Sequence, residues 1–251
     1  AQMALRDHLL LKGGDVVAAA GDAQALIRET CDAILAWLAD DGRWQVEPDR
    51  VLRPDGVTVP RARGGVGLIG RLVQEDVLIM APGTPEYRLA AGVLCFPSRW
   101  RLSEKLGRPL SRIHTPVPHY DDALAKRVNR LFEAVRPGVP LIRMNWLVHP
   151  TDRLDQPLGE AEKAAPFETD GPHFLRTERQ CLWRLPQSRA VLFTIKTTIT
   201  PVAGLAPDLR EAIAAAMGRW SAAEIAYRGG EAVWSGAMTA LRDQALAGAG
   251  Q

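Results

Sequence analysis

Two neighbouring segments, Phe174–Leu185 and Arg189–Thr200, carry the clearest hydrophobic and polar pattern of the chain. They are joined at Pro186-Gln187-Ser188, so the pattern predicts a β-hairpin. In the second segment apolar residues alternate with polar ones, which places the apolar residues on one face of a strand. That inward-facing set is Val191, Phe193 and Ile195.

Three further strands are expected before this hairpin. Glu75–Met80 and Tyr87–Phe96 flank the turn-rich sequence APGTPE and predict a second hairpin. Pro140–Val148 is the third of these strands, and alternate positions along it form an apolar face. That face consists of Ile142, Met144, Trp146 and Val148.

Helices are expected around these strands. The pattern predicts helical structure over Met3–Asp40, Leu124–Val135 and Pro207–Leu246, the last broken at Gly229-Gly230. Residues 41–64 are rich in Gly, Pro, Arg and Asp and indicate a loop with short extended pieces. Antiparallel strands with helices inserted between and around them indicate an α+β fold.

Composition narrows the class of protein. The 251 residues, 47% hydrophobic and 24% charged, can bury the core of one large domain. No apolar run approaches the roughly 20 residues of a membrane span, and a net charge of +2 gives no strong attraction to nucleic acid or membranes. Three separated cysteines argue against a disulfide framework or a zinc cluster. The start, AQMALRDHLLLKGGD, lacks the pattern of a signal peptide, so we expect a cytoplasmic protein.

A histidine in the segment FPSRWRLSEKLGRPLSRIHTPVPHY is the first candidate for chemistry. His114 precedes Pro116 and Pro118, which rule out a continuing helix and push the residues before them to extended geometry. A rigidly presented imidazole suits a metal or haem iron. The alternative is a core or surface histidine bonded to a carbonyl, and the spacing alone favours that alternative.

One charge breaks the pattern of the strand Phe174–Leu185. Arg179 is the single charged residue on an otherwise apolar face, so we expect it to be buried against a carboxylate, either a haem propionate or a protein Asp or Glu. The opposite face is expected to be solvated, and it holds Arg176, Glu178 and Gln180. Arg143 and Asn145 also point away from the apolar face of their strand, toward a polar cavity or toward water.

Two sequence features are not expected to carry function. Residues Gly65–Gly70 spell GVGLIG, a literal dinucleotide fingerprint, but its surroundings do not predict the parallel βαβ unit that such a site needs. Cys95 alternates with Val93 and is expected to be a small core residue rather than a thiolate ligand. No CxxCH sequence occurs, so any haem would be held non-covalently.

Matches to one family signature run in order along the chain. They are Leu72–Asp76, Phe96–Trp100, Glu104–Gly107, Pro109–Leu110, Ile113–His114, Pro116–Pro118, Tyr120, Asn145–Trp146, Glu178–Gln180, Arg184–Pro186, Val191–Lys196 and Tyr227–Gly229. In these positions the chain resembles the haem-subunit family of the haem-dependent oxidative N-demethylases (dimethylamine monooxygenases). His119 stands where the family has glycine and adds a second histidine beside His114.

The resemblance implies a PAS-like antiparallel sheet with helical N- and C-terminal extensions. It implies a single domain over 1–251, with a helical and loop extension at 1–64, a haem-binding core at 65–203 and C-terminal helices at 204–251. The implied activity is oxidative N-demethylation of a small methylated amine with O₂ and haem b. Electrons would come from a separate reductase subunit that uses NADPH, flavin and a [2Fe–2S] centre. The alternative is a PAS-like haem sensor of gas or redox state without turnover.

The resemblance also suggests roles for individual residues. His114, rather than His119, is expected to be the axial ligand of the haem iron. The cofactor-binding candidates are Arg179, Arg143 and Asn145, with Arg179 on a propionate. A small protonated amine needs a carboxylate or an aromatic face, and the candidates are Glu178 and Trp146.

Overall fold

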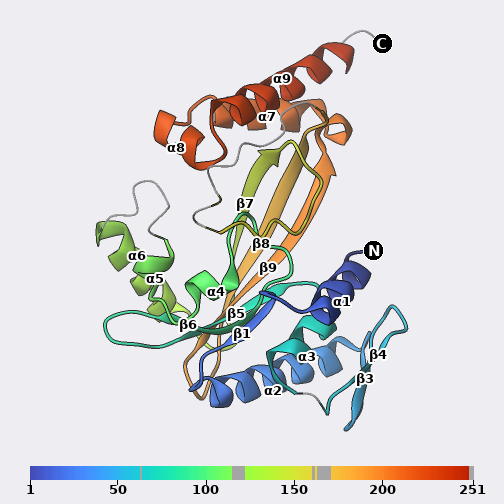
Figure 1. Cartoon of the computed structure of the whole chain (residues 1–251), viewed down its shortest axis with the longest axis vertical. Coiled ribbons are helices and arrows are strands. Elements are labelled where there is room, and N and C mark those ends of the chain that lie inside the picture. The colour runs from blue at the N-terminus through green and yellow to red at the C-terminus, as the bar shows by residue number, and fades with distance from the viewer. Residues whose placement is uncertain (63, 115–121, 160–161, 163–170, 249–251) are drawn as a thin grey trace.

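The computed structural model describes residues 1–62, 64–114, 122–159, 162 and 171–248. Within these ranges a six-stranded antiparallel sheet forms the centre of the molecule, in the strand order β1-β6-β5-β9-β8-β7 (Figure 1). Its strands are β1 (Val17–Ala19), β5 (Asp76–Ala81), β6 (Arg88–Val93), β7 (Leu141–His149), β8 (Phe174–Arg184) and β9 (Val191–Pro201). The α+β prediction is therefore confirmed, as are the hairpins β5–β6 and β8–β9.

The helical structure predicted over Met3–Asp40 is present as two helices, but a short strand, which was not predicted, lies between them. Helix α1 (Gln2–Lys12) ends at Gly13 and Gly14, whose φ angles of 74° and 93° are left-handed and interrupt a helix. The chain then forms β1, which pairs with β6, before α2 (Gln24–Asp41) begins. The prediction missed β1 because this alanine-rich segment shows no strand alternation.

The first face of the central sheet is covered by α1, α2 and α3 (Gly65–Leu72), with a small sheet beside them. That three-stranded antiparallel sheet consists of β2 (Gln45–Val46), β3 (Arg50–Leu52) and β4 (Thr58–Pro60). The GVGLIG sequence lies in α3, where a Cβ on Gly70 would stand 2.6 Å from Val93 Cγ2. Gly70 therefore serves close helix–strand packing, and the strand before α3 belongs to an antiparallel sheet, not to a parallel βαβ unit.

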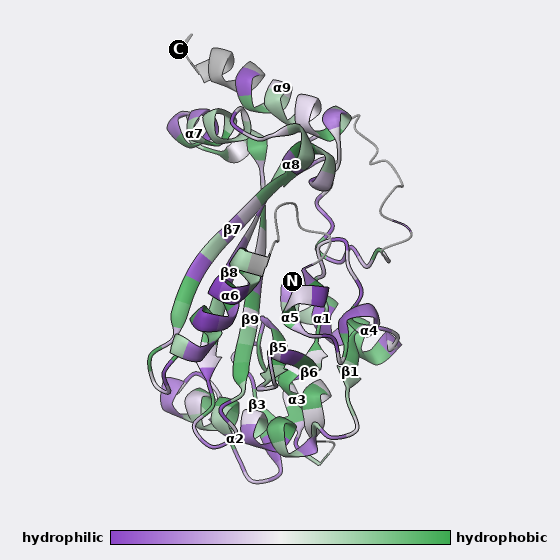
Figure 2. Cartoon of the chain, turned by 90° about the vertical axis from the view of Figure 1, so that its left-hand side faces the viewer, coloured by the Kyte–Doolittle hydropathy of each residue, from purple (hydrophilic) through white to green (hydrophobic). Residues whose placement is uncertain are grey.

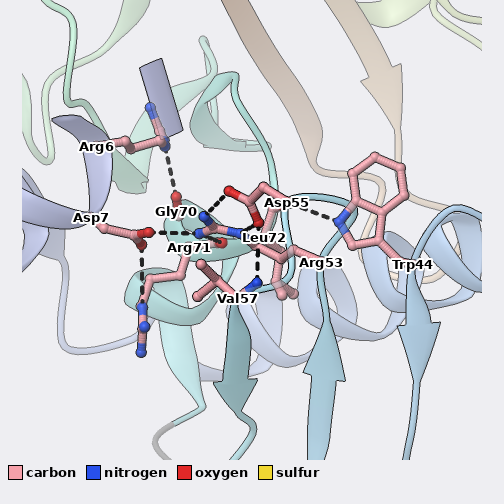
Figure 3. A network of polar contacts seen from close by, with 9 residues as sticks. All are labelled: Arg6, Asp7, Trp44, Arg53, Asp55, Val57, Gly70, Arg71 and Leu72. Atoms are coloured by element: carbon pink, nitrogen blue, oxygen red, sulfur yellow. Dashed lines mark hydrogen bonds and ion pairs between the residues drawn. The ribbon is translucent and has the colours of Figure 1, made fainter. Parts of the chain in front are cut away.

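A buried arginine ties the small sheet to the helices (Figure 3). Arg53 follows β3 and is only 3% exposed. It donates to Asp7 of α1 at 2.8 Å, to the Arg71 carbonyl of α3 at 2.8 Å, and to Asp55 in its own turn. Residues before position 64 thus share one packed core with the central sheet.

The second face of the sheet is covered by α4 (Leu102–Lys105), α5 (Leu110–Ile113) and α6 (Asp122–Ala134). Arg184, at the end of β8, is fully buried and donates to the carbonyls of Phe132 and Val135 at the end of α6. These carbonyls have no partner within a helix, so the arginine satisfies them and fixes α6 on the sheet. Alternate residues of β5 pack into the two different cores, which shows that both faces of the sheet are covered.

The C-terminal helices pack on the far end of β7, β8 and β9 (Figure 1). They are the 3₁₀ turn η2 (Val202–Gly204), α7 (Pro207–Met217), α8 (Ala222–Tyr227) and α9 (Glu231–Gly248). The predicted break at Gly229-Gly230 is present, between α8 and α9. Among the helices described, none has both the length and the apolar character needed to cross a bilayer.

Candidate functional site

The face of β7 and β8 that points toward α5 and α6 is polar over most of its length. Arg143 pairs with Gln180 and Asn145 pairs with Glu178 across the two strands, so all four side chains share one face. Leu182 lies on the same face and packs with residues of α5 and α6, which identifies the side of the sheet. Figure 2 shows hydrophilic and hydrophobic bands along β7, in keeping with this mixture.

Hydrogen bonds connect these side chains, with neutral amides and an arginine around one carboxylate. Arg143 Nε donates to Gln180 Oε1 at 2.7 Å, and Gln180 Nε2 donates to Glu178 Oε2 at 3.0 Å. Asn145 Nδ2 lies 3.4 Å from the same carboxylate oxygen. Arg176 Nε donates to the other oxygen, Oε1, at 3.2 Å. We call these five residues the polar face; its central carboxylate is neutralised by Arg176 and oriented by two amides.

Arg176 is the most deeply buried member of the polar face, with only 1% exposed. Besides Glu178 it binds the carbonyls of Phe96 at 2.6 Å and Leu154 at 2.9 Å, and it lies 3.4 Å from Thr197 Oγ1. A buried guanidinium needs this many acceptors because each unmatched donor costs free energy. Arg176 therefore joins the polar face to the loop segments that surround it.

His114 follows α5 on the same side of the sheet. Its Nδ1 lies 2.9 Å from the Leu110 carbonyl, which can only accept, so Nδ1 carries the proton. That tautomer presents Nε2 as the nitrogen with a lone pair, as a metal-ligating imidazole requires. Burial lowers the pKa of His114, and the nearby charges of Arg143 and Lys105 lower it further, so the ring is neutral at pH 7. His119 lies outside the described residues.

A second buried histidine belongs to the same face of β7. His149 is 2% exposed, and alternation places it on the side of Arg143 and Asn145. Burial first, and then the charges of Arg176 and Arg99, lower its pKa to about 3, so its ring is neutral at any physiological pH. The alternation 143, 145, 147, 149 was the signal in the sequence that could have identified it.

The structure reverses the prediction for the two faces of β8. The Arg179 side chain is 47% exposed and pairs with Glu75 at 3.3 Å, so the burial expected of it is wrong and its partner is a protein carboxylate. The face expected to be solvated is the buried one, with Glu178 8% and Gln180 6% exposed. The cause is coverage: α5 and α6 pack on the side of Glu178 and Gln180, whereas the other side is open at Arg179. Alternation along one strand does not say which of its two faces the helices cover.

Trp146 and Glu178 are not brought together. Trp146 lies on the opposite face of β7, where its ring stacks on Trp220 at 5.8 Å between ring centroids. The predicted apolar face of this strand is only partly covered, because Ile142 is 58% and Met144 60% exposed while Val148 is buried. This face of β7 becomes buried at Val148, where the C-terminal helices pack on the strand.

The donors present fit a haem better than a bare metal ion. Among the described residues no group of three or more His, Cys, Asp or Glu side chains could hold a metal ion. Burial raises the pKa of Cys95 to about 12, so in this structure it is a neutral thiol, in keeping with a small core residue. What this side of the sheet offers is one oriented imidazole, an apolar cluster that includes Ile113 and Phe132, and the cation Arg143. Such a set suits a cofactor that carries its own metal and carboxylates.

Comparison with known protein families identifies a match over most of the chain. The family described as haem-dependent oxidative N-demethylase, alpha subunit-like, matches residues 50–238. The match covers every residue of the polar face, His114 and α8, while α1 and α2 lie before it.

Proposed function

The chain belongs to the haem-dependent oxidative N-demethylase, alpha subunit-like, family, and from that premise we propose that it oxidatively removes a methyl group from a small methylated amine. The proposed co-substrate is O₂ and the proposed cofactor is a non-covalent haem b. The observation that carries the proposal is the placement of an oriented, neutral His114 on the side of the sheet that bears the polar face, whose central carboxylate Glu178 is buried.

We propose that the core of the chain is PAS-like. Counted from β5, the five long strands have the order 2-1-5-4-3, and α4, α5 and α6 lie between the second and third of them. This order and this insertion support a PAS-like sheet. One hydrophobic cluster joins α2 and α3 to β5 and β6, and another joins α7 and α9 to β7 and β8, which together support one domain for the whole chain.

His114 is the residue proposed to hold the iron. Its hydrogen bond to the Leu110 carbonyl fixes the ring and raises the basicity of the other nitrogen, as second-shell bonds to ligating histidines do. When bound, the haem would supply O₂ activation and the oxidising power for the N-methyl carbon, which no side chain can supply. Arg143 and Asn145 remain proposed cofactor-side residues, whereas Arg179, exposed and paired with Glu75, is removed from this set.

Glu178 is proposed to bind the protonated amine. The carboxylate is buried, and Arg176, Gln180 and Asn145 hold both of its oxygens in place. An ionised carboxylate has about four acceptor positions, so an ammonium N–H can be added to the three donors present. Trp146 has no part in this proposed site, since its ring lies on the other face of the sheet.

Electrons are proposed to come from a separate reductase subunit that uses NADPH, flavin and a [2Fe–2S] centre. The family description as an alpha subunit supports a partner of some kind. The three cysteines, Cys31, Cys95 and Cys181, are free thiols, which supports the cytoplasm as the proposed compartment.

The proposal is tested by spectroscopy and then by turnover. Protein produced with adequate haem should show a Soret band at stoichiometric haem. With dimethylamine, O₂ and an artificial reductant it should then release formaldehyde in proportion to the amine consumed. Haem without formaldehyde release from any small methylated amine would reject the enzyme and favour a haem sensor. A chain that binds no haem would reject both.

A further inference from the structure

Gln180 lies between two groups of opposite charge on the polar face. Its Oε1 accepts from Arg143 Nε at 2.7 Å, and its Nε2 donates to Glu178 Oε2 at 3.0 Å. A guanidinium only donates and a carboxylate only accepts, so one orientation of the amide satisfies both neighbours. With 6% of Gln180 exposed, water hardly competes for these two bonds.

Without this amide, Arg143 and Glu178 could pair directly. They are diagonal neighbours on β7 and β8, at a spacing that long side chains bridge. Glu178 is instead paired with Arg176 at 3.2 Å, and no described carboxylate forms an ion pair with Arg143. Arg143 is exposed, with its Nε anchored by Gln180. Its terminal nitrogens therefore form a fork of donors without a described acidic partner.

We propose that Gln180 is a positioning residue that holds Arg143 away from Glu178, so that the terminal nitrogens of Arg143 bind an anion beside His114. The inference rests on the proposed function, because the anion is either a small free ion or a carboxylate of the haem. Both present acceptor atoms to a planar guanidinium, which binds such groups better than an ammonium does.

The test uses the ferric, haem-loaded protein and measures two quantities by absorbance. One is the dissociation constant for azide, a small anion, and the other is the rate of haem loss to an excess of apo-globin. Arg143→Gln and Gln180→Glu should weaken azide binding at least about tenfold if the ligand is a free ion. They should speed haem loss at least about tenfold if the ligand is a haem carboxylate. Gln180→Glu acts by giving Arg143 a carboxylate partner of its own.

Controls separate this role from a structural one. Arg179→Gln removes an arginine from the other face of the same strand and should change neither quantity. The dissociation constant for imidazole, a neutral ligand, should stay within about twofold of the wild-type value in every variant. The guanidinium attracts an anion through its charge and has no such attraction for a neutral molecule. If Gln180→Glu does not fold, Gln180→Met removes both hydrogen bonds at similar length and should weaken the same quantity in the same direction.

The inference is overturned if Arg143→Gln and the Gln180 variants change neither the azide affinity nor the rate of haem loss. The proposed function would remain intact. A wild-type chain that shows no Soret band would reject the proposed function, and the inference with it.

Discussion

Asp76 and Arg176 hold the two sides of one residue, Phe96. Asp76 Oδ2 accepts from the Phe96 N–H at 3.0 Å, and Arg176 Nη2 donates to the Phe96 carbonyl at 2.6 Å. Asp76 forms a buried ion pair with Arg6 at 2.6 Å, and Arg176 forms a buried ion pair with Glu178 at 3.2 Å. The segment that leads from β6 into α4 is therefore fixed between two charged pairs, one reaching α1 and one belonging to the polar face.

Removal of Arg176 should cost more stability than any surface arginine. Arg176→Met leaves Glu178 as an uncompensated buried charge and leaves the Phe96 carbonyl without its donor. We expect a loss of about 3–5 kcal/mol in the free energy of unfolding, measured by urea denaturation. The control is Arg179→Met, three residues further along β8 and on its other face, whose exposed pair with Glu75 should contribute at most about 1 kcal/mol. Equal losses in the two variants would contradict this account of Arg176.

Arg184 should stabilise α6 in particular. Its guanidinium binds the Phe132 and Val135 carbonyls through a planar fork that lysine cannot reproduce. Arg184→Lys should therefore lower the protection of α6 amides against hydrogen exchange more than that of α7 amides. The matched control is Arg130→Lys, an exposed position on α6 itself, and it should leave the exchange pattern unchanged. A uniform loss of protection over both helices would show that Arg184 acts on the whole core.

Much of the fold could be predicted because the signals are local. The hairpin β8–β9 and the break between α8 and α9 follow from alternation, turn residues and glycines, which act within a few positions. The strand β1 could not be predicted, since its three residues are specified by pairing with β6, more than 70 positions away. Long-range pairing overrides the local preference of an alanine-rich segment for helix.

The candidate site was predictable in its residue types but not in its geometry. Arg143 and Asn145 were expected to point away from the apolar face of their strand, Glu178 was the carboxylate candidate for the amine, and the three side chains do lie together. Arg179 was chosen over Arg176 because alternation gives two faces and does not say which one a helix covers. The packing of α5 and α6 on the side of Leu182 determines that the face of Arg176 is the covered one. Cross-strand partners such as Gln180 depend on register, which the sequence of one strand does not contain.

Acid should destabilise the protein partly through His149. Its pKa is about 3 in the folded chain and ordinarily near 6.5, so between these values the unfolded chain binds more protons. Stability therefore rises with pH across this window and falls as pH drops below 6.5, by up to about 1.4 kcal/mol per pH unit for one proton. His149→Leu should flatten the pH dependence of the unfolding free energy between pH 4 and 6 by about this slope. An unchanged slope would show that His149 is protonated in the folded chain.

The absorption spectra of two alanine variants, at His114 and at His119, should show which histidine holds the haem iron. His114→Ala removes the imidazole whose Nδ1 is fixed by the Leu110 carbonyl, so the haem-loaded variant should lose its Soret band or shift it to a different coordination state. His119→Ala should keep the wild-type spectrum, since the resemblance to the family signature implies a glycine at this position and no role for its side chain. Added imidazole should restore the wild-type spectrum of His114→Ala, because the small ligand can occupy the space left by the ring. Loss of haem in His119→Ala with retention in His114→Ala would reverse the assignment. Loss in neither would direct the search to His149, the other buried imidazole on this side of the sheet.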